Sequence, residues 1–240
     1  MEMPQFSVDL LMVQSVIGRV HEKGERHLEG FVHLAGIDLE GDWHGDFGHH
    51  RDNAKAGSSR KGVEIAERLD MARIEAGVLT RSSEPVDLAD AIAGAVHDLR
   101  TRLTANPIHM DVSPDLPFVL VDPQLFQQCL INLIDNAAKY GEPGTPITIA
   151  AQREPGLLKL MVMDEGPGLP PGEEDRIFET FARIEGSDRK GGTGLGLAIV
   201  RGFCTAMGLS VSAANRTDTH GACFTISFDD AHLTNAEEPA

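Results

Sequence analysis

Two glycine-rich loops constrain the fold of this 240-residue chain more than any other feature. The first loop, DEGPG at residues 164–168, opens with a carboxylate at the end of an apolar run. The second loop, GTGLG at residues 192–196, leads directly into an apolar helical pattern. Glycine lets the backbone adopt positive φ and approach a ligand closely, and the N–H groups at a helix start bind phosphate. Together the two loops predict a nucleotide site.

The composition is that of a packed, acidic protein. Hydrophobic residues make up 41% of the chain, and the formal net charge is −16. This charge argues against a broad nucleic-acid surface, because phosphate backbones are bound through positive patches. The cysteines Cys129, Cys204 and Cys223 form no CxxC pair and favour a reducing compartment. No apolar run approaches the roughly 20 residues of a membrane helix, and residues 1–20 lack the features of a signal peptide. We therefore expect a cytoplasmic chain.

The texture of the sequence changes near residue 62. Residues 1–62 are irregular, with glycines every few positions from Gly18 onward, and each glycine inside a helix costs about 1 kcal/mol relative to alanine. From Val63 apolar residues recur at helical spacing up to a plausible stop at Gly77. We expect a separate domain over residues 81–230 and a disordered polar tail over residues 231–240.

The larger domain alternates helices with strands. Asp87 is expected to cap a helix that runs through Leu103, and Asp122 followed by Pro123 is expected to start a helix that ends near Tyr140. A third helix is predicted over residues 197–207. Strand-like segments occupy residues 108–112, 118–121, 147–150, 157–163, 209–213 and 223–228. This order predicts an α/β sandwich with helices on one face of the sheet.

A polar stripe follows the predicted helix over residues 122–140. Gln128, Asn132, Asn136 and Tyr140 recur at i, i+4 spacing and share a face, with Lys139 beside them. Asparagine carbonyl oxygens are hard neutral ligands that suit Mg²⁺, and a lysine one turn on can meet phosphate charge. The alternative is an ordinary solvated face on which two asparagines happen to align.

Asp164 closes the predicted strand over residues 157–163. A carboxylate there, backed by Gly166 and Gly168, can accept a hydrogen bond from an exocyclic amine such as the adenine 6-amino group. The alternative is an ordinary strand-to-turn sequence. Other nucleotide loops fit less well. The G-x-G-x-G spacing of residues 192–196 differs from the Rossmann fingerprint, no strand immediately precedes it, and no Gly-Lys-Ser/Thr follows as in a Walker loop.

The segment between the loops resembles a lid. Phe178 and Phe181 in a short helix could anchor it by apolar burial. Arg183 and Lys190 could reach phosphate, although both charges could equally be solvated.

Four segments together resemble the nucleotide-binding motifs of sensor histidine kinases, in that family's order. NLIDNAAKY at residues 132–140 resembles the N box, and DEGPG at 164–168 resembles the G1 box. Residues 178–181 resemble the F box and residues 192–196 the G2 box. The joint match is highly specific and extends over about residues 69–228.

Three further segments are most similar to the KdpD-type potassium-responsive sensor kinases. They are DMARIEAG at residues 70–77, FAR at 181–183 and GACF at 221–224. The first resembles the end of the family's second dimerisation helix, which the resemblance places over residues 63–80.

The resemblance implies the Bergerat ATP-binding fold of the kinase, gyrase, Hsp90 and MutL superfamily, an α/β two-layer sandwich with a mixed sheet and helices on one face. It also implies ATP and Mg²⁺ as cofactors. Asn132 and Asn136 would hold Mg²⁺, Asp164 would select adenine, and residues 166–192 would form the ATP lid. The ATP-binding residues so implied are Asn132, Asn136, Lys139, Tyr140, Asp164, Gly166, Gly168, Arg183, Gly192, Thr193, Gly194, Leu195 and Gly196.

The phosphoacceptor half of the motif is less complete. His21 lies at about the right distance before Asp70, and Glu22 follows it as the family pattern requires. Glu22 could orient the imidazole or accept its proton. Arg26 stands where the family has proline, however, and the following segment is rich in glycine. Residues 1–61 could therefore be a degenerate or frame-disrupted remnant of the dimerisation hairpin.

A metal site is a further alternative in this region. His44, His49 and His50 with Asp42 and Asp46 offer ligand atoms, but their spacing fits no standard site.

The leading expectation is a protein-histidine kinase of a two-component system. It would pass the ATP γ-phosphoryl group to a histidine and then to an aspartate on a response-regulator receiver domain. A homodimer is the oligomeric state that this reading allows. The alternative is an ATP-binding module or truncated kinase that lacks histidine autophosphorylation. An ATP-gated dimerisation machine of the Hsp90 or MutL kind is a third class, disfavoured because the chain lacks the long additional domain of those proteins.

Overall fold

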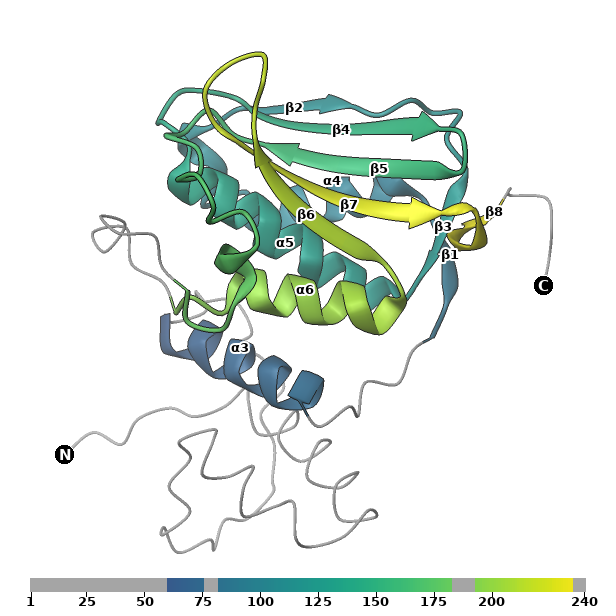
Figure 1. Ribbon diagram of the computed structural model, residues 1–240, viewed down its shortest axis with the longest axis horizontal. Helices are drawn as coiled ribbons and strands as arrows, with labels where there is room; N and C mark the ends of the chain where they lie inside the picture. Colours follow the sequence, from purple (N-terminus) through teal and green to yellow (C-terminus); the bar gives the residue numbers. More distant parts are fainter. Residues whose placement is uncertain (1–59, 76–81, 183–192, 235–240) are drawn as a thin grey trace, which may run out of the picture. The chain divides into compact units, whose positions relative to one another are not determined.

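The computed structural model describes residues 60–75, 82–182 and 193–234, which belong to two compact units divided after Glu75 (Figure 1). In the first unit it describes one helix, α3 (Arg60–Glu75), which agrees with the helical pattern predicted from Val63. His21, Glu22 and the histidines at 44, 49 and 50 lie outside the described residues.

The second unit contains two β-sheets. The five-stranded sheet has the order β2-β4-β5-β7-β6, and the three-stranded sheet has the order β1-β3-β8. β2 runs parallel to β4, whereas the other neighbouring pairs are antiparallel, so the larger sheet is mixed as predicted. The strands are β1 (Glu84–Val86), β2 (Ile108–Asp111), β3 (Phe118–Val121), β4 (Ile147–Glu154), β5 (Leu157–Met163), β6 (Ser210–Asn215), β7 (Ala222–Asp229) and β8 (Leu233–Thr234).

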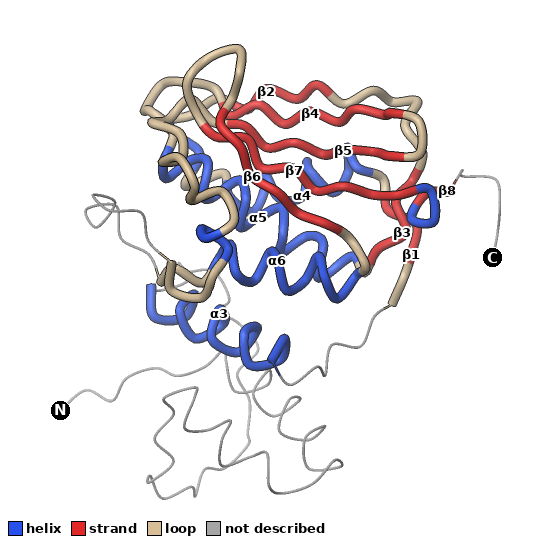
Figure 2. The backbone as a smooth tube through the Cα atoms, in the orientation of Figure 1, coloured by secondary structure: helices blue, strands red, loops and turns tan. Residues whose placement is uncertain are grey.

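Three helices cover one face of the five-stranded sheet (Figure 2). They are α4 (Leu88–Leu99), α5 (Pro123–Tyr140) and α6 (Gly196–Met207). Their apolar stripes meet the inward residues of β4, β5 and β7, and the edge of the Phe126 ring packs against Phe228 with centroids 5.9 Å apart. Burial of these faces provides the main driving force for the two-layer arrangement.

Helix ends follow the predicted signals. The Asp87 carboxylate accepts hydrogen bonds from the N–H groups of Ala89 and Asp90, and Asp122 does the same at the start of α5. Gly208, at φ 81°, closes α6 in the left-handed conformation that favours glycine. One helix is shorter than predicted. α4 ends at Leu99, and residues 103–105 form a separate 3-10 turn, η2 (Leu103–Ala105).

The chain stays ordered beyond residue 230. A 3-10 turn, η5 (Asp230–His232), is capped by Asp229, and β8 then pairs Leu233 with Val119 of β3. The disordered tail expected from residue 231 is therefore wrong for residues 231–234, and residues 235–240 lie outside the described part. The two residues of β8 are too few to show strand alternation in the sequence. Among the described helices, none has both the length and the apolar character needed to cross a bilayer.

Candidate nucleotide site

The polar stripe of α5 contacts the second glycine loop. Asn132 is half-buried, and its Nδ2 donates to the carbonyl oxygen of Gly196 at 3.4 Å. Its Oδ1 accepts from Nε2 of Gln128 at 3.3 Å. The helix is held in this orientation because its opposite face, which includes Leu133 and Ala137, is fully buried. Two motifs that are far apart in the sequence therefore meet at the start of α6.

The last turns of α5 carry the remaining polar residues of the stripe. The Asn136 side chain is half-buried and makes no hydrogen bond to the parts of the chain that the structure describes. The Lys139 ammonium lies 4.9 Å from the centre of the Tyr140 ring, in a cation–π contact. The Asn136 amide can therefore serve a ligand from outside the chain.

Asp164 is a buried carboxylate at the end of β5, with 3% of its surface exposed. Its Oδ1 accepts from the backbone N–H of Gly166 at 2.8 Å and from that of Ala222 at 3.2 Å. Its own N–H donates to the Ala222 carbonyl at 3.0 Å. These bonds compensate the cost of burying a charged group, and they set the direction in which the carboxylate points.

Close packing explains the glycines of the first loop. A Cβ on Gly166 would lie within 3.0 Å of the Tyr140 carbonyl oxygen, which real Cβ atoms essentially never do. Gly168 has φ +75°, and its Cβ would meet Oδ1 of Asn215 at 2.5 Å. The loop thus approaches the end of α5 on one side and the end of β6 on the other, which brings Asp164 near Tyr140.

The second glycine loop ends in an uncapped helix. Thr193 Oγ1 accepts from the N–H of Leu195 at 3.2 Å, and the Leu195 side chain is buried. Leu195 therefore contributes to the core, and its N–H is already bonded. α6 begins at Gly196 without a side-chain cap, in contrast to α4 and α5. Its first N–H groups are suited to an anion.

The two phenylalanines between the loops have different roles. Phe178, in the 3-10 turn η3 (Arg176–Phe178), is 2% exposed and packs edge-on against Phe224, with ring centroids 6.4 Å apart. The Arg201 guanidinium lies over its ring at 4.6 Å. Phe181 is 66% exposed and has φ 63°, and its N–H donates to the Gly194 carbonyl at a turn of the chain. The expectation that both rings anchor the segment is therefore wrong for Phe181.

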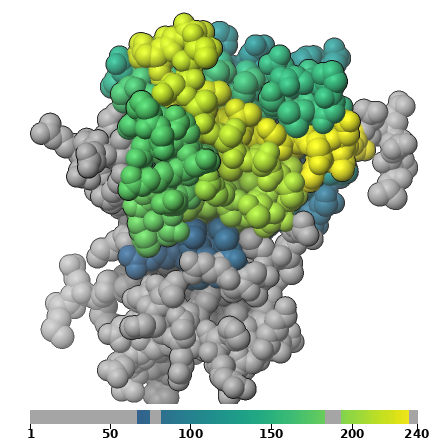
Figure 3. Space-filling model, viewed as in Figure 1, coloured from purple at the N-terminus to yellow at the C-terminus, as the bar shows by residue number. Residues whose placement is uncertain are grey.

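The segment after β5 packs beside α6 and β6 and forms one continuous surface with them (Figure 3). Arg201 of α6 donates to the Asp175 carbonyl at 3.1 Å. Three predicted cation or loop positions, Arg183, Lys190 and Gly192, lie outside the described residues.

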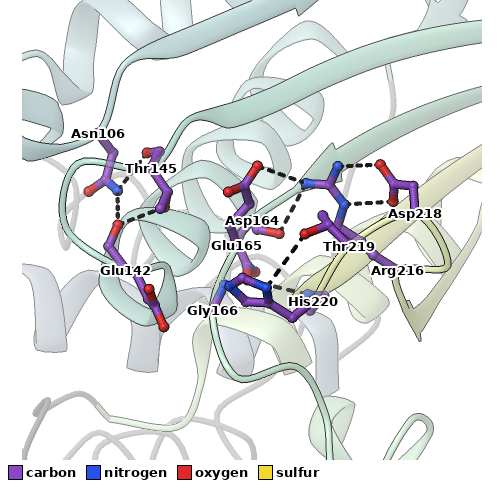
Figure 4. Close-up of polar contacts among 11 residues, drawn as sticks. Asn106, Glu142, Thr145, Asp164, Glu165, Gly166, Arg216, Asp218, Thr219 and His220 are labelled. Carbon is purple, nitrogen blue, oxygen red and sulfur yellow. Dashed lines mark hydrogen bonds and ion pairs between the residues drawn. The ribbon is translucent and has the colours of Figure 1, made fainter.

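Sequence reasoning missed two residues that contact the segment after β5. Both lie about fifty positions further along the chain than the residues they contact. The Asn215 side chain accepts from the N–H of Leu169 at 2.6 Å and donates to its carbonyl at 2.9 Å. The Arg216 guanidinium donates to the Asp164 carbonyl at 3.3 Å (Figure 4). No local pattern marks either residue, since each depends on which loops the sheet brings together.

Among the described residues there is no cluster of histidine, cysteine, aspartate and glutamate side chains that could hold a metal ion, and no reactive thiol. A hydrogen bond with Cys204, together with burial, raises the pKa of Cys129, and burial raises that of Cys223. Arg216 lowers the pKa of Asp218 to about 2 through its hydrogen bonds. Cys129 and Cys223 therefore stay protonated, in agreement with a structural role.

Comparison with known proteins decides the family. Residues 121–232 match the family described as "Histidine kinase-, DNA gyrase B-, and HSP90-like ATPase". The sensor protein KdpD of Escherichia coli strain K12 is 39% identical over 170 residues, which is 71% of this chain and 19% of KdpD. A solved structure of the mycobacterial sensor histidine kinase MprB is 30% identical with a TM-score of 0.55, and the match covers 62% of this chain and 97% of that one. The chain belongs to the sensor histidine kinases.

A further solved structure is similar to this chain. Full-length ShkA, solved in complex with AMPPNP, is 30% identical with a TM-score of 0.62, over 73% of this chain and 36% of ShkA. The Bergerat fold predicted for the catalytic region is confirmed by the similarity to the MprB histidine kinase structure. This chain spans only 19% of the length of the curated KdpD relative.

Proposed function

We propose that residues 81–230 bind ATP with Mg²⁺ and that the chain acts as a protein-histidine kinase of a two-component system. One observation carries the proposal: the end of α5, the turn after β5 and the uncapped start of α6 come together. Asn132 bonds Gly196, and Gly166 packs against the Tyr140 carbonyl. Residues 121–232 of this chain match the histidine kinase-like ATPase family, and the chain is 39% identical to a KdpD sensor protein over 170 residues.

The side chains at this junction fit a magnesium nucleotide. Amide oxygens such as those of Asn132 and Asn136 are hard neutral ligands of the kind Mg²⁺ accepts. Lys139 and the N–H groups at the start of α6 would hold phosphate oxygens, and Asp164 would accept a hydrogen bond from the adenine amine. When bound, ATP would supply the phosphoryl group and Mg²⁺ would neutralise its charge.

Phosphoryl transfer depends mainly on positioning and charge neutralisation. The residues of α5 and α6 would orient the γ-phosphoryl group toward the acceptor, and residues 166–192 would exclude water as a lid. His21 is the proposed acceptor, with Glu22 orienting its imidazole. Residues 63–80 would complete a dimerisation helix in a homodimer, and a receiver-domain aspartate would take the phosphoryl group next.

A second candidate is an ATP-binding module without histidine autophosphorylation. It is favoured by the region around His21, where Arg26 replaces the family's proline and glycines recur. This candidate shares the nucleotide site and differs only in the acceptor.

Phosphate labelling separates the two candidates. The full chain is incubated with Mg²⁺ and ATP that is radioactive in its γ-phosphate, and the protein-bound label is tested in acid and base. The kinase proposal expects acid-labile, base-stable label that is lost in His21→Gln. ATP binding without label would favour the second candidate, and absence of ATP binding would contradict both. Undiminished label in His21→Gln would exclude His21 as the acceptor.

Asn136→Ala is expected to weaken binding of magnesium ATP by roughly 50-fold, on the scale by which losing a metal-site partner lowers affinity. The substitution removes an amide oxygen that no described residue uses. Isothermal titration with Mg²⁺ and then with EDTA measures the effect, because the two proteins should differ little once the metal is removed. Equal affinity in Mg²⁺ would contradict the assigned role of Asn136.

A further inference from the structure

Arg216 joins the β6–β7 turn to the first glycine loop. It is the residue after β6, and its backbone N–H donates to the Gly221 carbonyl at 2.9 Å, which closes the turn. Its side chain is 9% exposed and points toward the loop that begins at Asp164 (Figure 4). The turn therefore places a largely buried cation directly behind the proposed adenine-reading residue.

The Arg216 guanidinium donates hydrogen bonds to two residues and forms an ion pair with a third. Nε and Nη2 donate to the two carboxylate oxygens of Asp218 at 3.1 and 2.6 Å. Nη1 donates to the Asp164 carbonyl at 3.3 Å and lies 3.8 Å from a carboxylate oxygen of Glu165. The bidentate pair with Asp218 sets the plane of the guanidinium, so the donor directed at Asp164 has a defined position.

Arg216 acts on the peptide that leads from Asp164 to Gly166. The Asp164 carbonyl belongs to the Asp164–Glu165 peptide, and the next N–H but one, that of Gly166, holds Oδ1 of Asp164. The Gly166 N–H belongs to the next peptide along the chain. If the Asp164 carbonyl were released, the Asp164–Glu165 peptide could rotate, and the backbone that follows could move the Gly166 N–H away from the carboxylate. The bond from Arg216 therefore stabilises the carboxylate orientation through the backbone.

Charge gives Arg216 a second effect on the same loop. Asp164, Glu165 and Asp218 all carry carboxylates, and the guanidinium bonds or pairs with the last two and with the backbone of the first. Without this cation, the carboxylates of the turn would repel those of the loop. The repulsion would move the loop away from the β6–β7 turn.

We propose that Arg216 is a positioning residue for base selection, which holds the Asp164 carboxylate in the orientation that accepts the adenine 6-amino group. The inference rests on the proposed nucleotide site and adds a residue from outside the four motifs. Asp218 is part of the same device because it orients the guanidinium.

The test compares two nucleotides that differ at the 6-position. Binding of ATP and of purine riboside triphosphate, which lacks the 6-amino group, is measured by isothermal titration for the full chain and for Arg216→Met. We expect the wild-type chain to prefer ATP. Arg216→Met should bind ATP about tenfold more weakly, the scale of one hydrogen bond to a charged group, while its affinity for the analogue stays within about twofold. A merely structural role would weaken both nucleotides equally.

Matched variants make the result specific. Arg153 lies at the end of β4 that is remote from the proposed site, where it pairs with Asp230. Arg153→Met should therefore leave both affinities unchanged. Arg216→Lys should recover only part of the preference, since an ammonium cannot reproduce the planar fork. In an Asp164→Asn background, Arg216→Met should have no further effect on the preference, because both changes act through one carboxylate.

Three outcomes would overturn the inference. Both nucleotides could keep their wild-type affinities in Arg216→Met, both could weaken equally, or the effects of Arg216→Met and Asp164→Asn on the preference could be additive. Where Arg216→Met does not fold by circular dichroism, Asp218→Asn decides, with an expected loss of about threefold in ATP preference. A wild-type chain that binds neither nucleotide would instead contradict the proposed function itself.

Discussion

Asp164→Asn is expected to weaken ATP binding by roughly 100-fold, which corresponds to about 3 kcal/mol. Oδ1 of Asp164 accepts from two backbone N–H groups, those of Gly166 and Ala222. An asparagine must keep its amide oxygen at this position, so its NH₂ group takes the place of the second carboxylate oxygen. A donor then faces the adenine amine, which is also a donor. Isothermal titration with ATP measures the loss.

The same geometry predicts that Asp164→Asn shifts the base preference toward purines with an acceptor at the 6-position. A purine triphosphate with a 6-oxo group presents an acceptor, so Asp164→Asn should bind it better, relative to ATP, than the wild-type chain does. Asp230→Asn, the same substitution at an exposed ion pair with Arg153, is the control and should leave both affinities unchanged. Unaltered ATP affinity in Asp164→Asn would refute the adenine-reading role.

Gly221→Ala is expected to destabilise the second unit by about 3 kcal/mol, the sum of backbone strain and overpacking. Gly221 has φ +126°, which disfavours any side chain. The atoms nearest an added Cβ would be the carbonyl oxygen and carbon of Asp164, both within 3.0 Å. Because these are backbone atoms, the strand end and the loop must separate. Urea unfolding followed by circular dichroism measures the change, and ATP affinity should fall with it.

Gly144→Ala separates the cost of backbone strain from the cost of steric overlap. Gly144 also has positive φ, +90°, but an added Cβ there would have no atom within 4 Å. Its cost should therefore be about 1 kcal/mol, from the left-handed backbone alone. Equal losses in the two variants would show that close approach to Asp164 contributes nothing at Gly221.

Local signals in the sequence predicted much of the fold. Asp87 and Asp122 are found as helix caps because a cap needs only its own side chain and the next few N–H groups. The stripe of Asn132 and Asn136 was visible because helical spacing alone puts i and i+4 on one face. The mixed sheet was expected from the order of strands and helices together with the family resemblance.

The errors arose where long-range contacts decide. Phe181 has the same apolar character as Phe178, yet it is exposed, at a turn where its N–H donates to the distant Gly194 carbonyl. β8 has two residues, and only its pairing with β3 makes it a strand. Neither property can be derived from the spacing of residues along the chain.

The sequence by itself identified the candidate residues for a nucleotide site: the amides of α5, the carboxylate Asp164 and the two glycine loops. Only the tertiary structure decided how they are held. The Gly196 carbonyl meets Asn132, and the β6–β7 turn brings Arg216 against the backbone of Asp164. The physical reason is range. Caps and periodic faces depend on neighbouring residues, whereas the orientation of a buried carboxylate depends on donors that the sheet brings from distant segments.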